Sequence, residues 1–351
     1  MSKANASVFE RLVSFAETRG VSIPDRQEAR WVSSTIEEKE RLKHSEILIS
    51  INFGRFRHLS WIAFNDIHYI ASFGFEHEMS DPSLIPLEDA AGFDVCLLSE
   101  IPVFPSASAI EVLDVVAAGS KKDGSGYHGH DNFMIRNLFP PLRIYECVSR
   151  LDEGTVWPNF LSICAAETQH GGSWIDLQLA DSLAALAQSP IDYFPYQELC
   201  RSTLDLDPRS LFMSLYRCIE ATYAHEKATK LKNALSVEHS WSELAAILES
   251  EMSWRPLEAE SLNNVLKHAS EDDLEEICKS LKRDTGKNIA ASAGAAIYKL
   301  RNRIVHYRPT KDPFDMNSID WNHVCTVLVS IARDVFHRAY HEEKNSAGGN
   351  P

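Results

Sequence analysis

Residues 289–307 read IAASAGAAIYKLRNRIVHY, and this stretch decides how the second half of the chain folds. At about 100° per residue, four apolar side chains share one face of a helix. They are Ala293, Ile297, Leu300 and Ile304. Pro309 cannot continue a helix, because its ring removes the backbone N–H group. The pattern therefore predicts a long helix from about Ile289 to Tyr307 with one buried face.

Start signals and apolar spacing predict further helices on both sides of this stretch. The candidate N-terminal caps are Asp207, which precedes a proline, Ser240, which opens a capping box, and Ser270. The side chains expected to face inward are Leu211, Leu215, Ile219 and Tyr223, and, in a last helix from about 318 to 343, Trp321, Val324, Leu328, Ile331 and Val335. Residues 201–343 are thus expected to form an all-helical bundle of about five or six helices, followed by a disordered tail at 344–351.

The first 200 residues have a different pattern. Residues 1–44 form a charged segment of helical character, and residues 45–200 contain short apolar runs typical of strands. The strand candidates are 47–53, 69–75, 95–98, 110–116 and 142–148. A helix is predicted at 173–187, so residues 45–200 are expected to form a mixed α/β domain of unassigned topology. The chain as a whole is therefore predicted to be α+β.

Within that domain, the glycine-rich segment 119–131 is predicted to be a polar surface loop. It lacks the GxxxxGK[ST] spacing of a phosphate-binding loop. His128, His130 and Asp131 could bind a metal ion, but no further ligand stands at helical spacing from them. The surface loop is the favoured interpretation.

Composition limits the class of protein. Hydrophobic residues make up 44% and charged residues 24% of the 351 residues, which is typical of a folded protein. No uncharged apolar run reaches about 18 residues, so no membrane span is predicted. The N-terminus lacks the apolar core of a signal peptide. Seven scattered cysteines without a CxxC pair predict single buried thiols in a reducing cytoplasm.

The net charge of −15 is unevenly distributed along the chain. Residues 1–200 contain 15 Lys and Arg against 28 Asp and Glu, whereas residues 201–351 contain 20 against 22. Because phosphate binding needs local cations, contact with nucleic acid is expected in the second half. The acidic first domain could screen a basic cleft, which suggests a sensing or restraining role for it.

A basic segment at the end of the long helix carries the candidate chemistry. Five cations fall within 13 residues with no acid before Asp312, namely Lys299, Arg301, Arg303, Arg308 and Lys311. His306 points away from the apolar face, and Asn302 lies four residues before it on the same side. Arg301 is offset from His306 by about 140°, but its side chain is long enough to reach round the helix.

These side chains suit the cleavage of RNA. Histidine titrates near neutral pH and can exchange a proton with the 2′-hydroxyl group or with the leaving oxygen. Arginine forks onto phosphate oxygens and can stabilise the charge that develops in the transition state. The 2′-hydroxyl group is itself the nucleophile, so no metal or other cofactor is expected. No carboxylate cluster suited to Mg²⁺ stands out in the sequence.

The order Arg301-Asn302-Arg-Ile-Val-His306, in an all-helical half and before one more long helix, resembles the HEPN superfamily, whose hallmark is R-x4–6-H. The segment LYRCIE at 215–220 is similar to the first long helix of such domains. The resemblance covers about residues 205–342 and leaves the first 200 unassigned. One subgroup is modified on a tyrosine in the pattern R-x4-H-x-Y; here Tyr307 directly follows His306, so the chain departs from that pattern.

The resemblance implies a metal-independent endoribonuclease that acts as a homodimer. Two motifs, one from each subunit, would face each other in one composite cleft. Cleavage there would leave a cyclic phosphate at the end of the RNA product. Many members are toxins or effectors of antiviral defence and abortive infection, switched by a partner domain. By position, His306 would be the acid and base, Arg301 would bind phosphate and Asn302 would support them. Further candidates are Lys299, Arg303, Arg308 and Lys311 for RNA phosphates, and Glu220 as a weaker support from the first helix.

Two other interpretations remain open. Arg301 and His306 could belong to a solvated basic face near a helix C-terminus, where the helix dipole favours cations. The helical half could also be a catalytically silent HEPN-like dimerisation module, regulated by a sensor domain at the N-terminus. Such modules lose the Arg or the His of the motif, and this chain has both, together with the Asn.

Overall fold

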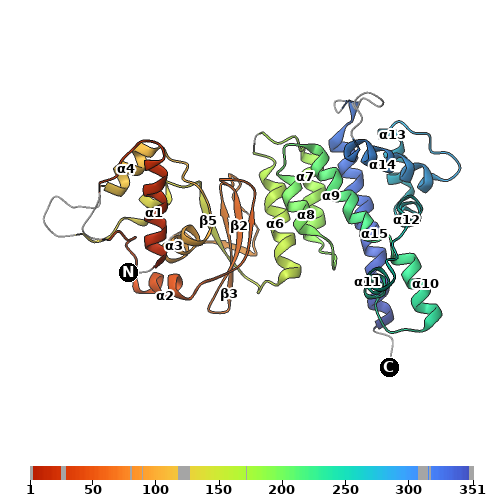
Figure 1. Ribbon diagram of the computed structural model, residues 1–351, viewed down its shortest axis with the longest axis horizontal. Helices are drawn as coiled ribbons and strands as arrows, with labels where there is room; N and C mark the ends of the chain where they lie inside the picture. Colours follow the sequence, from red (N-terminus) through yellow and green to blue (C-terminus); the bar gives the residue numbers. More distant parts are fainter. Residues whose placement is uncertain are drawn as a thin grey trace. The chain divides into compact units, whose positions relative to one another are not determined.

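The computed structural model describes residues 3–24, 29–79, 81–88, 90–117, 127–170, 172–306, 315 and 318–347, with 341–347 described by their backbone alone. The chain divides into two compact units, Met1–Val156 and Trp157–Pro351. The first contains a five-stranded antiparallel sheet with helices, and the second is helical (Figure 1). The predicted α+β class, with a helical C-terminal part, is therefore confirmed.

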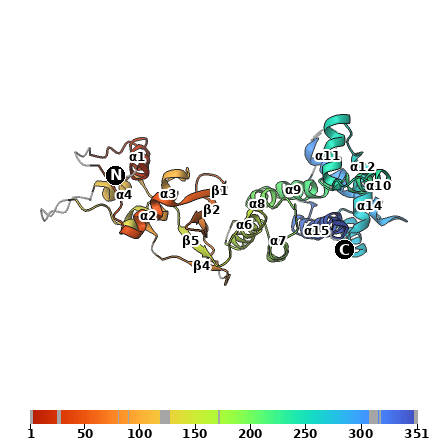
Figure 2. The same ribbon diagram turned by 90° about the horizontal axis from the view of Figure 1, so that it is seen from below.

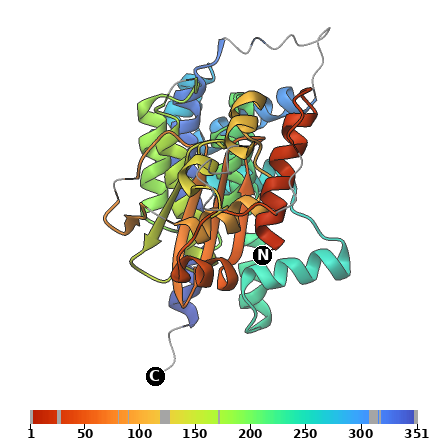
Figure 3. The same cartoon turned by 90° about the vertical axis from the view of Figure 1, so that its left-hand side faces the viewer.

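The sheet of the first unit has the strand order β1-β2-β3-β5-β4, and every neighbouring pair is antiparallel (Figure 3). Its strands are β1 (Glu46–Asn52), β2 (His58–Phe64), β3 (Ile67–Phe73), β4 (Leu84–Pro86) and β5 (Leu142–Cys147). Its helices are α1 (Lys3–Glu17), α2 (Ile36–His44), α3 (Ala91–Glu100), α4 (Ala109–Ala117) and α5 (Asn132–Arg136). Asn65 and Asp66, both at positive φ, make the two-residue turn between β2 and β3, and these residue types tolerate that conformation.

Helices cover one face of this sheet. Alternate residues of β3, Tyr69, Ala71 and Phe73, share a core with Phe9 and Leu12 of α1 and with residues of α3 and α4. Successive side chains of a strand point to opposite faces, so this set marks the helical side. The segment 1–44 contains the helices α1 and α2, in line with its predicted helical character, and α1 supplies part of this core, so the segment belongs to the same unit as the sheet.

Two predicted strands, 95–98 and 110–116, are helices. Residues Ala91 to Leu98 of α3 are all buried, so the apolar run has no polar face that would reveal a helical period. The sequence of α4 is rich in β-branched residues, but Ser108 and Glu111 cap it reciprocally, with Ser108 N–H donating to Glu111 and Glu111 N–H donating to Ser108. The capping pair Ser108 and Glu111 is the sequence signal from which this helix could have been predicted instead of a strand.

The segment after α4 also differs in part from its prediction. Residues 118–126 lie outside the described residues. His130 is buried rather than placed on a surface loop, and its ring is hydrogen-bonded to the Tyr127 hydroxyl and to the Val116 carbonyl. Among the described residues, no group of three or more His, Cys, Asp or Glu side chains is placed to hold a metal ion.

The second unit contains ten α-helices among its described residues. They are α6 (Glu153–Glu167, which begins just before the unit boundary), α7 (Leu177–Gln188), α8 (Tyr196–Thr203), α9 (Pro208–Glu220), α10 (His225–Leu235), α11 (Trp241–Met252), α12 (Glu258–Val265), α13 (Glu271–Ser280), α14 (Ile289–Val305) and α15 (Trp321–Ala347). A 3-10 turn, Leu266–His268, follows α12. Asp207, Ser240 and Ser270 cap their helices as predicted.

The long helix α15 organises this unit, packing against α7, α9 and α13 (Figure 2). The inward-facing residues predicted for the first and last helices of the bundle are all buried. The predicted domain boundary at 200/201 is wrong, because α7 packs on α15 and α8 packs on α9. The predicted start of the tail at 344 is also wrong, since α15 continues to Ala347, before two consecutive glycines.

All seven cysteines are free and buried, as the sequence predicts. No helix among the described residues is long and apolar enough to cross a bilayer.

Candidate functional site

Helix α14 carries the candidate motif in its last two turns. Asn288 caps its N-terminus by accepting a hydrogen bond from the N–H of Ala291. Ala293, Ile297 and Leu300 are buried as predicted, whereas Ile304 is only partly buried. The helix ends at Val305, and His306 is its C-terminal cap, with its backbone N–H donating to the carbonyl of Asn302 at 2.8 Å.

A close approach of two helices places an acidic partner beside Arg301. A Cβ atom added to Gly294 would lie 2.2 Å from Oδ1 of Asn263, so the side chain of Asn263 in α12 occupies the space that glycine leaves on α14. About two turns further along α14, Arg301 meets Glu258 at the start of α12. The two helices therefore run antiparallel across this contact.

The guanidinium of Arg301 is held on three sides. Its Nη2 lies 3.1 Å from Oε1 of Glu258, and its Nη1 donates to Oδ1 of Asn302 at 2.9 Å. Its central carbon lies 5.7 Å from the ring centroid of Tyr216 in α9. The Arg301 side chain is only 21% exposed. It is thus a positioned residue and not part of a solvated basic face.

Two buried tyrosines extend this cluster. The hydroxyl of Tyr223 donates to the hydroxyl of Tyr216 at 3.2 Å, and Tyr216 donates to Oε1 of Glu258 at 2.8 Å. Burial raises the pKa of both tyrosines, so both remain neutral donors. The hydrogen bonds therefore run in one direction, from Tyr223 through Tyr216 to the carboxylate that pairs with Arg301.

Glu220 of α9 lies close to the same charges. Burial and the neighbouring carboxylate of Glu258 raise its pKa, while Arg301 and Arg217 lower it. Glu220 is thus near Arg301, as expected of a supporting residue from the first helix, but Glu258 is the ion-pair partner. Neither Glu258 nor a role for Tyr216 was predicted from the sequence.

His306 lies on a different face of α14 from Arg301. At about 100° per residue, His306 falls within about 60° of Lys299 and Arg303 and about 140° from Arg301. Its side chain is exposed, and no hydrogen bond or ion pair of its imidazole occurs among the described residues. Asn302 connects the two faces, since its side chain binds Arg301 and its carbonyl accepts from His306. The expected reach of Arg301 round the helix to His306 is not found.

A small basic cavity lies on the His306 side of α14. It has a volume of about 190 Å³, and no acidic residue is among the described residues that line it. Four cationic side chains do line it, Lys282, Arg283, Lys299 and Arg303. Lys282 and Arg283 follow α13, where Lys282 adopts a left-handed conformation at φ 54° and the N–H of Arg283 bonds back to the carbonyl of Cys278. This helix ending turns two cations toward α14, and the sequence prediction missed both.

A second cavity, of about 540 Å³, lies on the Arg301 side. Glu220, Glu249 and Glu258 line it with a single arginine, Arg255, which pairs with Glu249 at 2.9 Å. Aromatic side chains, among them Trp254, complete its walls. The net negative charge of this cavity disfavours the binding of phosphate.

The structure thus brings Arg301 and Asn302 together, places Lys299 and Arg303 round one cavity, and leaves His306 exposed beside them. Tyr307, Arg308 and Lys311 lie outside the described residues. Comparisons of the chain with protein-family models, with curated proteins and with solved structures return no match.

Proposed function

We propose that the helical unit binds RNA along the His306 face of α14 and cleaves it as a metal-independent endoribonuclease of the HEPN type. The observation that carries this proposal is the cavity whose described walls carry four cations, on the same helical face as an exposed histidine. A cluster of four cations attracts the phosphate backbone in a chain that is otherwise acidic.

The reaction needs two proton transfers. His306 takes the proton of the 2′-hydroxyl group as its oxygen attacks the adjacent phosphorus. The P–O5′ bond breaks, the leaving oxygen takes up a proton, and a 2′,3′-cyclic phosphate remains. Lys299 and Arg303 neutralise the charge that develops on the phosphate oxygens. A second imidazole, from a homodimer in which two motifs share one cleft, supplies the proton to the leaving oxygen.

Arg301 acts in this proposal as a positioning residue. Its guanidinium is engaged by Glu258 and Tyr216, and it reaches the His306 face only through Asn302. It therefore fixes the amide of Asn302 next to the reacting phosphate. This role replaces the direct phosphate contact that the sequence resemblance assigns to the arginine.

The resemblance to HEPN proteins also suggests a biological role. We infer a toxin or an effector of antiviral defence, of the abortive-infection kind, in the cytoplasm, where seven free thiols stay reduced. The first unit would sense a regulatory protein or ligand and restrain the nuclease.

A second candidate is an RNA-binding or dimerisation module that does not cleave. The engagement of Arg301 by Glu258, on the side away from His306, favours it. The two candidates separate when wild type and His306→Ala are incubated with total RNA and with tRNA in EDTA, beside His239→Ala, which removes an exposed histidine elsewhere in the unit. The nuclease predicts cleavage by wild type and by His239→Ala only. RNA binding without cleavage supports the silent module.

A further inference from the structure

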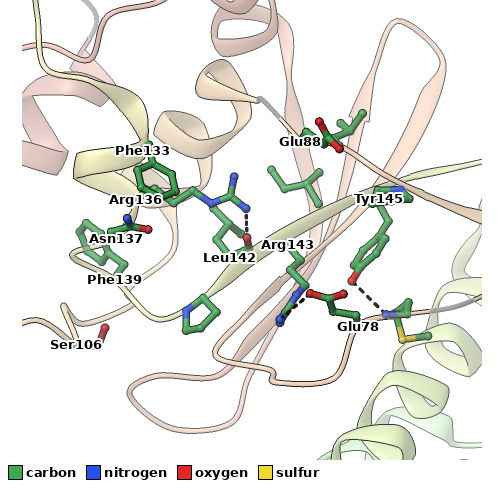
Figure 4. A pocket seen from close by; sticks show the side chains of 15 residues that line it. Glu78, Glu88, Ser106, Phe133, Arg136, Asn137, Phe139, Leu142, Arg143 and Tyr145 are labelled. Atoms are coloured by element: carbon green, nitrogen blue, oxygen red, sulfur yellow. Dashed lines mark hydrogen bonds and ion pairs between the residues drawn. The ribbon is translucent and has the colours of Figure 1, made fainter.

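The first unit contains a cavity of about 750 Å³ beside the start of β5 (Figure 4). Its walls come from α5 and the turn after it, from β5, and from the segments on either side of β4. The volume falls within the range of roughly 300–1,000 Å³ that is typical of small-molecule sites. None of its residues belongs to the candidate site on α14.

Two arginines from different elements reach this cavity. Arg136 of α5 donates to the carbonyl of Leu142 (Figure 4), and Arg143 of β5 donates to the carbonyl of Phe75. Their side chains are 21% and 25% exposed. A guanidinium has five N–H donors, so each arginine is fixed by a backbone carbonyl and keeps donors for a ligand. Two such prearranged cations favour an anion.

The carboxylates near the two arginines leave room for that anion. Asp94, 3.6 Å from Arg136, is completely buried and accepts a hydrogen bond from Asn132, so it belongs to the protein core. Glu78, 3.3 Å from Arg143, has a side chain that is 79% exposed. Glu88 also lines the cavity and is exposed (Figure 4). Exposed ion pairs are weak, and an incoming anion can take the place of Glu78 on Arg143.

An exposed aromatic ring lines the same cavity. Phe133 of α5 is 66% exposed, one helical turn before Arg136. Its flat ring offers a stacking surface beside the two arginines. On the far side, Tyr145 is buried and fixed by the N–H of Met79, which donates to its hydroxyl at 3.2 Å. The cavity therefore combines anion-binding groups with a face for a planar group.

We propose that this cavity binds a small organic anion that carries a flat ring. Its phosphate or carboxylate lies against Arg143 and Arg136, and its ring lies on Phe133. The site gives the first unit a ligand of defined chemistry, and it stands whether or not the helical unit cleaves RNA.

Isothermal titration calorimetry of the full chain tests the proposal with four probes. Adenosine 5′-monophosphate and phenylacetate combine a ring with a phosphate or a carboxylate, whereas adenosine lacks the charge and inorganic phosphate lacks the ring. At least one of the two ring-bearing anions is expected to bind at least about tenfold more tightly than adenosine and inorganic phosphate. Preference for one of the two identifies the anionic group. Failure of both to bind at millimolar concentration overturns the proposal.

Three variants locate the binding. Arg143→Gln is expected to weaken it about tenfold, through loss of a charge-assisted hydrogen bond, and Phe133→Ala about threefold to tenfold. Arg150→Gln removes an exposed arginine of the same unit outside the cavity and leaves the affinity unchanged. Phe133 is so exposed that its variant remains informative if Arg143→Gln disturbs folding. Equal affinities for wild type, Arg143→Gln and Phe133→Ala would place the ligand elsewhere and refute the site.

Discussion

Replacing Tyr216 with phenylalanine removes one hydroxyl group from the middle of the hydrogen-bond chain that holds Arg301. In the wild type this hydroxyl donates to Glu258 at 2.8 Å and accepts from Tyr223 at 3.2 Å. Tyr216 is completely buried, so no water replaces the missing group at its own position. The variant keeps the ring, the packing and the contact with the guanidinium of Arg301.

The expected loss of stability follows from these contacts. A hydrogen bond to a charged group contributes about 1.5–3 kcal/mol, and a buried donor left without a partner, here the Tyr223 hydroxyl, costs about 1 kcal/mol or more. The side chain of Glu258 is 29% exposed, so water can replace part of what it loses. We therefore expect Tyr216→Phe to lower the free energy of unfolding by about 2 kcal/mol, which is a large share of the roughly 5–15 kcal/mol of an ordinary domain.

Because the chain has two units, unfolding must be measured locally. Hydrogen exchange with mass spectrometry across a urea series gives the unfolding free energy from peptides of α9 and α14. Tyr298→Phe is the matched control: Tyr298 lies on α14, and its hydroxyl makes no hydrogen bond among the described residues, so a change below about 0.5 kcal/mol is expected. Equal protection of these peptides in Tyr216→Phe and Tyr298→Phe would refute the hydrogen-bond chain.

Three further predictions concern charges. In fluorescence anisotropy, Lys282→Gln should weaken RNA binding and reduce the steepness of log association constant against log salt concentration by about 0.7. Lys230→Gln, a substitution on α10 away from the cavity, should leave this slope unchanged. Glu220→Gln should raise stability at neutral pH, because burial and Glu258 raise the pKa of Glu220 and so disfavour its charged form in the folded state. Urea midpoints should show that this gain shrinks as pH falls through the raised pKa and vanishes below the ordinary glutamate pKa of about 4.3. A gain that is equal at all pH values would count against this reasoning. Arg301→Lys keeps the charge but loses the fork that holds Glu258 and Asn302, so kcat should fall about tenfold or more with little change in KM; a change in KM alone would indicate direct RNA binding by Arg301.

The helical architecture was largely predictable, because its signals are local. Asp207, Ser240 and Ser270 each cap the helix that they were predicted to open, and the period of α14 and α15 identifies their buried faces. The first unit was harder. Its helix α3 is buried all round, so its residues show no helical period, and a short apolar run of that kind fits a strand equally well.

The candidate site was predictable only in part. Asn302 and His306 follow from spacing within one helix, but Glu258 comes from α12, whose N-cap residue Leu257 has no side chain that can cap the helix. Its pairing with Arg301 is a tertiary contact between α12 and α14. Lys282 and Arg283 likewise join the site through the packing of α13 on α14, which no local pattern encodes.

If His306 activates a ribose 2′-hydroxyl group on the basic face of α14, cleavage must require both His306 and that hydroxyl. A short RNA, and the same RNA with 2′-deoxyribose at the cleaved position, are incubated in EDTA with the wild type and with His306→Ala. We expect a 2′,3′-cyclic phosphate product from the unmodified RNA alone, at a rate that is about 10²- to 10⁴-fold lower with His306→Ala than with the wild type. Absence of cleavage by the wild type, equal cleavage by His306→Ala, or cleavage at the deoxyribose position would contradict this role of His306.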